Sequence, residues 1–252
     1  MTYGLWLSAA GLQVNQHKQA VIANNLANLS TTGFKRDLAV FRERRVESES
    51  GAGGGNFRHQ LLDGLTGGTW QNPTATDFSQ AALEQGGPLD VAVEGDGFFK
   101  VQVGDQVRYT RDGRFTLDAS GDLVTEAGGH PVLDPSDQPI HIGRVAASRI
   151  AIGSTGKIRI GDQQVGTLGV TDFADRSLLV KAGQNTFDGR HAEPAEATGR
   201  VVQGHSETSG VEPTTELIGM IESARAYQLN AMLISLQDGM LGRVVNDVGR
   251  VA

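Results

Sequence analysis

Apolar residues recur every seven positions along the last forty residues of the chain. One series consists of Met220, Tyr227, Ile234, Leu241 and Val248. A second series leads the first by three positions and consists of Leu217, Ala224, Ala231, Asp238 and Val245. Spacings of three and four place both series on one helical face, which is the narrow seam of a coiled coil. Such a helix needs a partner, because packing supplies most of a helix's stability.

A thinner seam runs through residues 3–29 and predicts a second helix. Its apolar positions are Leu5, Leu12, Ile22, Leu26 and Leu29. Gly33 follows a polar turn and is expected to stop this helix. We expect the two terminal helices to pair with each other or with copies in neighbouring subunits. The alternative is two ordinary amphipathic helices packed on a central domain.

Three asparagines lie within five positions near the end of the first helix: Asn24, Asn25 and Asn28. Asparagine is a weak helix former, so its repeated use inside a helix needs a reason. Its amide can hydrogen-bond across a packed interface, which fixes alignment more than it adds stability. We therefore hypothesise that the three asparagines set the register between subunits.

The middle of the chain predicts a connecting arm followed by an all-β domain. Short strands with regular turns between residues 89 and 205 favour a small barrel or sandwich. Asp112-Gly113 predicts a hairpin between strands at 107–111 and 114–118. The expected fold is α+β, with N- and C-terminal helices pairing in a coiled-coil-like layer beside a central β domain. The expected segments are an N-terminal helix at 1–36, an extended arm at 37–88, the β domain at 89–205 and a C-terminal helix at 206–252.

Composition narrows the classes of protein that this chain can be. Glycine accounts for 34 of 252 residues, against a usual share of about 7%. The net charge of −7 disfavours nucleic acid as a partner, because that partner requires a basic surface. The absence of cysteine excludes disulfides and thiolate metal sites. No apolar run approaches the roughly 20 residues of a membrane span, and the first residues lack the pattern of a secretory signal peptide.

No motif indicates catalysis. Residues 153–157 (GSTGK) match a phosphate-binding loop only in part, because Ala151 stands where the first glycine belongs and Ile158 replaces the Ser or Thr that would hold magnesium. The six histidines are scattered without metal-ligand spacing. We expect no catalytic, cofactor-binding or metal-binding residues and no enzymatic activity.

Four runs of residues are the most distinctive in the sequence: 23–36 (ANNLANLSTTGFKR), 89–101 (LDVAVEGDGFFKV), 109–115 (YTRDGRF) and 210–230 (GVEPTTELIGMIESARAYQLN). In this order they resemble the signatures of the flagellar hook–basal body (rod) protein family of bacteria. Gly210 departs from that family, which usually has Asn there, but both residues tolerate positive φ.

The resemblance implies a structural axial subunit of the flagellar basal-body rod. Its terminal helices would polymerise in the inner tube, and its partners would be copies of itself and neighbouring rod and hook proteins. It would leave the cell through the flagellar type III export apparatus, without a cleaved signal peptide, and lie in the rod that spans the periplasm. Residues 170–174 (VTDFA) and 211–213 slightly favour the proximal rod, whereas the length of the arm at 37–88 suits the distal rod.

The expected assembly interface lies on both helices. Its residues are Leu5, Leu12, Ile22, Asn24, Asn25, Leu26, Asn28, Leu217, Met220, Ala224, Tyr227, Ala231, Ile234 and Leu241. The alternative function is a secreted module whose β domain binds a glycan or a protein and whose helices dimerise it. An aromatic content of only 6% weighs against that alternative.

Overall fold

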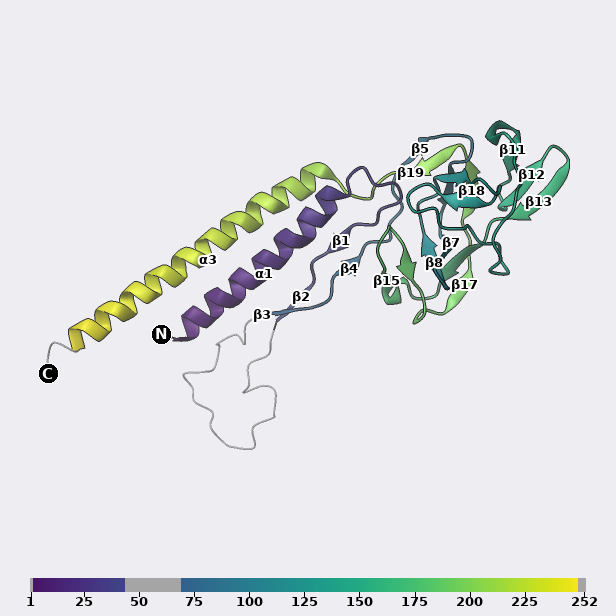
Figure 1. The fold of residues 1–252 in the computed structure, drawn as a ribbon. Helices are drawn as coiled ribbons and strands as arrows, with labels where there is room; N and C mark the ends of the chain where they lie inside the picture. The colour runs from purple at the N-terminus through teal and green to yellow at the C-terminus, as the bar shows by residue number, and fades with distance from the viewer. Residues whose placement is uncertain (1, 44–68, 249–252) are drawn as a thin grey trace, which may run out of the picture. The chain divides into compact units, whose positions relative to one another are not determined.

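The computed structural model describes residues 2–43 and 69–248. The chain divides into two compact units (Figure 1). The helical unit takes residues 1–27, 37–75 and 212–252, and the β-rich unit takes residues 28–36 and 76–211. The α+β class predicted from the sequence is confirmed. Residues 76–88, which the sequence placed in the arm, belong to the β-rich unit.

Two long helices dominate the helical unit. Helix α1 spans Thr2–Ala27 and helix α3 spans Pro213–Val248, and they lie side by side in opposite directions (Figure 1). Proline suits the first position of α3, because its missing N–H would lack a helical partner there anyway. Helix α1 ends well before Gly33, so the expectation that Gly33 stops the helix is wrong.

Short strands accompany α1 in the same unit. Strand β2 (Phe41–Glu43) pairs with β3 (Thr69–Gln71) in antiparallel register, and β1 (Asp37–Leu38) pairs with β4 (Ala75–Thr76). The ring of His17 on α1 meets the edge of Phe41 at a centroid distance of 5.9 Å. The connecting region therefore folds back along α1 where the structure describes it.

The β-rich unit is built on a six-stranded sheet. Its strands follow the order β15 (Val180–Lys181), β16 (Phe187–Asp188), β8 (Gln106–Thr110), β7 (Phe98–Val103), β14 (Val170–Phe173) and β17 (Pro194–Glu196). Gly104 makes the tight turn between β7 and β8, with a φ of 60° that suits glycine.

Smaller antiparallel sheets complete this unit. They are β5 (Leu83–Gln85) with β19 (His205–Glu207), β6 (Val91–Glu94) with β18 (Arg200–Gln203), β9 (Phe115–Leu117) with β10 (Leu123–Thr125), and β11 (Ile150–Ile152), β12 (Lys157–Ile160) and β13 (Gln163–Thr167) together. Two 3₁₀ turns belong to the same unit: η1 (Ala147–Arg149) precedes β11, and η2 (Arg176–Leu178) lies between β14 and β15.

Two apolar clusters fill the interior of the β-rich unit. The larger is aliphatic and includes Val91, Val101, Leu123 and Ile158, none of which is exposed. The smaller is aromatic, and the rings of Phe98 and Phe187 meet within it at a centroid distance of 5.8 Å. These clusters give the unit a core that does not depend on the helices.

The hairpin predicted at Asp112-Gly113 is wrong. Strand β8 pairs with β7 and β16, and β9 pairs with β10, so the strands on either side of Asp112-Gly113 do not pair with each other. The segment packs instead on β6, where the Val91 N–H donates to the Gly113 carbonyl at 2.9 Å. A Cβ at Gly113 would lie 1.6 Å from the Val91 carbonyl oxygen, so this glycine permits a close backbone crossing rather than a turn.

Candidate assembly interface

Small and polar residues line the contact between α1 and α3. A Cβ at Gly4 would lie 2.7 Å from the amide nitrogen of Gln237, and one at Gly11 would lie 2.8 Å from Oδ1 of Asn230. Ser223 is buried at 1% exposure on the same face of α3. The amide side chains thus fill space that the two glycines leave open, and the helices approach closely there.

The residues of α3 that contact α1 differ from one of the two series predicted there. Glu216 and Ser223 are buried and Asn230 and Gln237 are half-buried, one position before the series that began at Leu217. Leu217 is 53% exposed, and Ala231, Asp238 and Val245 are also exposed, whereas Ala224 is half-buried. Polar side chains therefore take part in the contact with α1, and the role of the Leu217 series in assembly stays a prediction.

The other series lies closer to its predicted place. Met220, Ile234 and Leu241 are half-buried, although Tyr227 is 39% exposed. On α1, Ile22 is buried and its Cδ1 would lie 3.3 Å from a Cβ at Gly219. Leu5, Leu12 and Leu26 are half-buried. The side chain of Val248 lies outside the described residues, and Leu29 follows the end of α1.

Asn25 connects three elements within the helical unit. Its Nδ2 donates to Glu216 Oε1 at 3.1 Å and to the Asp37 carbonyl at 2.9 Å, and its Oδ1 accepts from the Asp37 N–H at 2.9 Å. Asn25 is 1% exposed and Glu216 is 7% exposed. The negative charge of Glu216 also lies in the first turn of α3, where the helix dipole favours it.

The three asparagines do not form one set. Asn24 is exposed and its Nδ2 lies 3.4 Å from Asp37 Oδ2. Asn28 lies in the turn after α1, where its Oδ1 accepts from the Thr31 hydroxyl at 3.2 Å and its carbonyl accepts from the Ser209 hydroxyl. The hydrogen bonds of Asn25 to Asp37 and Glu216 are made inside the subunit, so the three asparagines differ in their surroundings.

The face of α3 that points away from α1 is exposed and rich in apolar residues, and the charged side chains of Glu222 and Arg225 lie on it as well. Its large apolar residues are spaced by three, four or eight positions, which keeps them on one side of a helix with about 3.6 residues per turn. Their exposures range from 52% to 63%, and they are Ile218, Ile221, Leu229, Met232, Leu236 and Met240. We call these six residues the outer stripe. Large apolar side chains gathered on one exposed helix face indicate a candidate interaction site.

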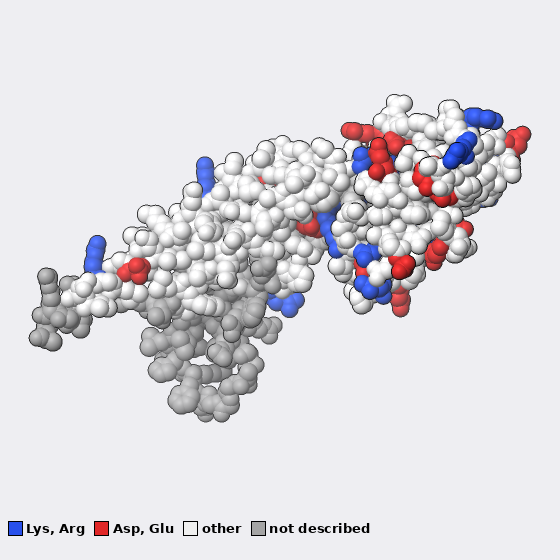
Figure 2. Space-filling view, in the orientation of Figure 1, with Lys and Arg blue, Asp and Glu red and all other residues white. Residues whose placement is uncertain are grey.

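Charged side chains are sparse on the helices and dense on the β-rich unit (Figure 2). Lys18 is the only charged residue of α1. The exposed apolar side chains of α3 are suited to further helix packing rather than to contact with water.

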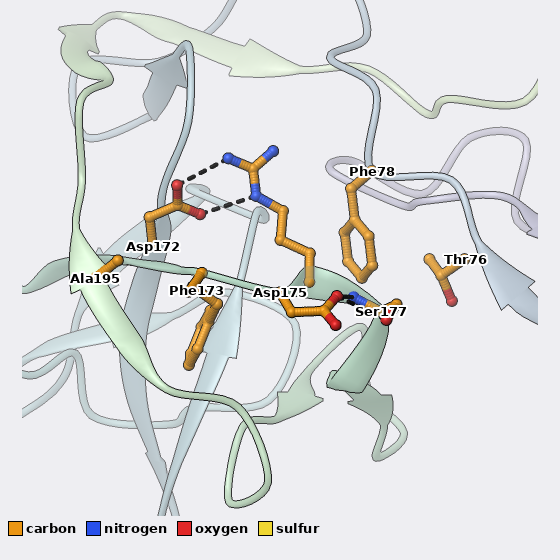
Figure 3. Close-up of a pocket in the computed structure, with 9 residues that line it drawn as sticks. Thr76, Phe78, Asp172, Phe173, Asp175, Ser177 and Ala195 are labelled. Atoms are coloured by element: carbon orange, nitrogen blue, oxygen red, sulfur yellow. Dashed lines mark hydrogen bonds and ion pairs between the residues drawn. The ribbon is translucent and has the colours of Figure 1, made fainter.

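A shallow depression lies on the β-rich unit, and an ion pair between Arg176 and Asp172 borders it (Figure 3). Arg176 donates two hydrogen bonds to the Asp172 carboxylate, at 2.8 and 2.9 Å, and contacts Asp96 at 2.8 Å. Hydrogen bonding to Asp172 raises the pKa of Arg176, and the same contact lowers the pKa of Asp172. Groups held ionised in this way are poor proton carriers near neutral pH.

The other residues that line the depression include a carboxylate that caps a 3₁₀ turn and two phenylalanine side chains. Asp175 accepts from the backbone and hydroxyl of Ser177, and Phe78 and Phe173 line the wall. No group of three or more His, Asp or Glu side chains in the described ranges could hold a metal ion. Among the described helices, none is long and apolar enough to cross a membrane.

Sequence comparison connects three stretches of the chain to one family. Residues 7–35 match the model of the flagella basal body rod protein, residues 92–160 match the D1 domain of the flagellar hook protein FlgE/F/G, and residues 202–247 match the C-terminal region of the flagellar basal body rod FlgEFG protein. The matches fall in the same order as the four runs found in the sequence.

Whole-length relatives agree with these matches. The chain is 37% identical to the flagellar basal-body rod protein FlgG of Buchnera aphidicola subsp. Schizaphis graminum, over 97% of the chain and 99% of the relative. It is 34% identical to the flagellar basal-body rod protein FlgF of Caulobacter vibrioides, over 92% and 91%. It is 29% identical to FlgG of that same Caulobacter strain, over 93% and 95%.

Proposed function

This chain belongs to the flagellar basal-body rod protein family, and we propose that it polymerises through its two terminal helices into the axial rod of the basal body. The family is structural rather than enzymatic. Self-assembly by repeated contacts between different faces of one subunit produces a helical tube when the contacts do not close into a ring.

The outer stripe is the observation that carries the proposal. It leaves six large apolar side chains more than half exposed on one helix. Covering such side chains contributes roughly 25 cal/mol for each Å² removed from water, so a neighbouring helix gains stability by packing there. Leu217, Tyr227 and Ala231 are exposed as well and are available for contacts between subunits.

Localisation tests the proposal most directly. Mass spectrometry of purified basal bodies should detect this chain in the rod fraction, with its N-terminal peptide intact if export occurs by the type III route without signal cleavage. Its absence from basal bodies would contradict the proposal and favour the alternative, a secreted glycan- or protein-binding module.

Substitutions on α3 test the surface itself. Leu229→Lys and Met232→Lys place charges in the outer stripe and should abolish incorporation into rods. Asp238→Lys is the matched control, because that exposed position on the same helix already carries a charge. If both stripe variants assemble as well as the control, rods are built through another surface.

The asparagines receive separate roles in this proposal. Asn25 aligns α1 and α3 inside the subunit, while Asn24 and Asn28 contribute to register between subunits. Replacing Asn24 and Asn28 with Ala should impair motility while leaving the β-rich unit folded. Normal swimming in that double variant would remove the register role.

We propose that the chain lies in the proximal rod, which is slightly favoured over the distal rod. Besides residues 170–174 and 211–213, support comes from the two Caulobacter relatives, because the chain is more identical to the one named FlgF than to the one named FlgG. The 37% identity to FlgG of Buchnera supports the distal rod instead. Chemical cross-linking of isolated rods, followed by identification of the chain's neighbours, decides between the two positions.

A further inference from the structure

The β-rich unit contains a cluster of three buried charges that neither its apolar core nor the proposed helix packing uses. Lys35 Nζ lies 2.6 Å from Glu207 Oε1, and Arg111 Nη1 lies 3.4 Å from Glu207 Oε2. The three side chains are only 1–2% exposed. We call Lys35, Arg111 and Glu207 the ion cluster.

Backbone carbonyls complete the cluster. Lys35 Nζ donates to the Ser79 carbonyl at 2.7 Å. Arg111 donates to the Val93 carbonyl at 3.2 Å and to the Gly95 carbonyl at 2.9 Å, and its guanidinium lies over the Phe98 ring at 5.0 Å. Each cation is therefore tied to a different stretch of chain as well as to the one carboxylate.

The residues around the cluster come from the distinctive runs of the sequence. Lys35 belongs to residues 23–36 and Arg111 to residues 109–115, while Val93, Gly95 and Phe98 belong to residues 89–101. Glu207 lies three residues before the fourth run, at 210–230. Motifs far apart along the chain thus meet at one carboxylate.

The same carboxylate lies where the chain passes between the two units. The chain crosses after residues 27, 36, 75 and 211. Three segments of the β-rich unit adjoin these crossings and are hydrogen-bonded to one another. We call them the collar, and they are residues 28–36, 76–81 and 207–211. The bonds run from Gly33 N–H to the Glu207 carbonyl at 2.7 Å, from Gly210 N–H to the Phe34 carbonyl at 2.8 Å and from Asp77 N–H to the Arg36 carbonyl at 2.9 Å.

A cluster of this kind contributes geometry more than stability. Removing three charges from water is costly, and a buried ion pair often adds little net stability compared with apolar residues of the same size. Removing one partner is nevertheless strongly destabilising, because it leaves a charge buried without compensation. The Ala81 N–H also donates to Glu207 Oε1 at 2.9 Å, so Glu207 ties all three segments of the collar together.

We propose that Lys35, Arg111 and Glu207 are positioning residues that keep the three segments of the collar bonded to one another, which we call the closed collar. The closed collar fixes the place at which the chain enters and leaves the β-rich unit. The proposal has a second step, which is that rod assembly requires the closed collar. Only this second step rests on the proposed function.

Hydrogen exchange on the purified full-length chain tests the first step without reference to flagella. Glu207→Gln leaves two buried cations without an anion, so the amides of Gly33, Asp77 and Gly210 should exchange roughly 100-fold faster or more. The amide of Leu168, bonded to the Gly156 carbonyl beside strands β12 and β13, should keep its protection. Asp137→Asn is the matched control, because it breaks the exposed Lys100–Asp137 pair with the same change of chemistry.

A milder variant keeps the test decisive if Glu207→Gln does not fold. Lys35→Met removes one cation and leaves Arg111 and Glu207 balanced, so the chain should fold. Its Asp77 and Ala81 amides should still exchange roughly ten-fold faster, because both Glu207 and the Ser79 carbonyl lose a donor. Wild-type protection of these amides in Lys35→Met would overturn the proposal.

Rod incorporation tests the last step. Lys35→Met should reduce the amount of this chain in purified basal bodies at least ten-fold while Asp137→Asn leaves it unchanged. Normal incorporation of Lys35→Met with an open collar would show that assembly does not need the cluster. If the wild-type chain is itself absent from basal bodies, the proposed function is wrong. The hydrogen-exchange experiment still tests the role of the ion cluster in the collar, because it does not depend on assembly.

Discussion

Asn25 uses both ends of its amide inside the helical unit. It satisfies the backbone of Asp37 in both directions and gives the buried Glu216 carboxylate a donor. A hydrogen bond to a charged group is worth more than one between neutral groups, and its loss leaves the charge buried without a partner. One side chain therefore joins α1, β1 and α3.

Replacing Asn25 with Ala should destabilise the helical unit by about 2–3 kcal/mol, because the buried Glu216 carboxylate loses a donor. Thermal unfolding followed by circular dichroism at the helical band measures the change. Gln16→Ala, at an exposed position on α1, is the control and should shift stability by at most about 0.5 kcal/mol. Equal melting of the two variants would show that the Asn25 contacts add nothing.

Acid should weaken the β-rich unit through two carboxylates. Backbone hydrogen bonding from Ser79 lowers the pKa of Asp77, and hydrogen bonding from Arg176 lowers the pKa of Asp172. A pKa lower in the folded state than in the unfolded state favours folding above the unfolded value of about 3.9, and this contribution is lost as the pH falls through the lower folded values. Calorimetry should show Tm falling below about pH 4. Asp172→Asn should reduce that dependence, and an unchanged slope would exclude Asp172 as a source.

At the scale of elements, α3 leaves several large apolar residues on the side that α1 does not cover. Polar and small residues share the contact with α1 with apolar ones such as Ile22 and Met220, and the outer stripe is left exposed. Covering the outer stripe would remove further apolar area from water, so packing against another helix would add to the stability of the pair.

Substitutions at Gly239 and Gly242 can distinguish the stability of α3 in the monomer from the close packing of α3 in the rod. Among the described residues, nothing lies within 4 Å of a Cβ built at either position. Gly239→Ala and Gly242→Ala should each stabilise α3 in the monomer by about 1 kcal/mol through helix propensity. If neighbouring subunits approach closely at these glycines, the same variants should assemble poorly. Helix melting and counts of rods per cell measure the two effects.

The sequence predicts the elements whose signals are local. Both long helices were predicted nearly to their ends, because seven-residue periodicity persists over many turns. The β-rich character of residues 89–205 was also predicted, since short runs there are bounded by clear turn residues. Strands such as β16 and β19 were missed, because two or three residues are too few to show alternation.

The sequence misleads where pairing is not local. Asp112-Gly113 has the composition of a hairpin turn, but its partner, Val91, lies far away along the chain. One of the two series predicted on α3 lies one residue after the polar residues that contact α1, because only apolar residues were counted. Gly4 and Gly11, seven residues apart like Asn230 and Gln237, were the signal that could have located that contact. The sequence did not predict the ion cluster, because its only signal there is that Lys35 and Arg111 are charged residues inside distinctive runs.

At the scale of the whole molecule, the absence of cysteine makes the chain suited to site-specific labelling. Leu236→Cys in the outer stripe and Asp105→Cys in the turn between β7 and β8 are both exposed in the subunit. A maleimide should label both readily in the monomer. In intact rods, Leu236→Cys should react roughly ten-fold more slowly than it does in the monomer, because a neighbouring helix covers it. Equal reactivity in rod and monomer would show that the outer stripe stays uncovered.

The opposed glycines and amides also restrict how this chain can change length during evolution. Gly4 faces Gln237, Gly11 faces Asn230, and Asn25 bonds Glu216, so a step of seven along α1 matches a step of seven back along α3. A single inserted or deleted residue in either helix would rotate every later pair by about 100° and turn a bulky side chain towards each amide. Homologous sequences should therefore gain or lose residues in these helices in sevens, or else confine such changes to the segments between them.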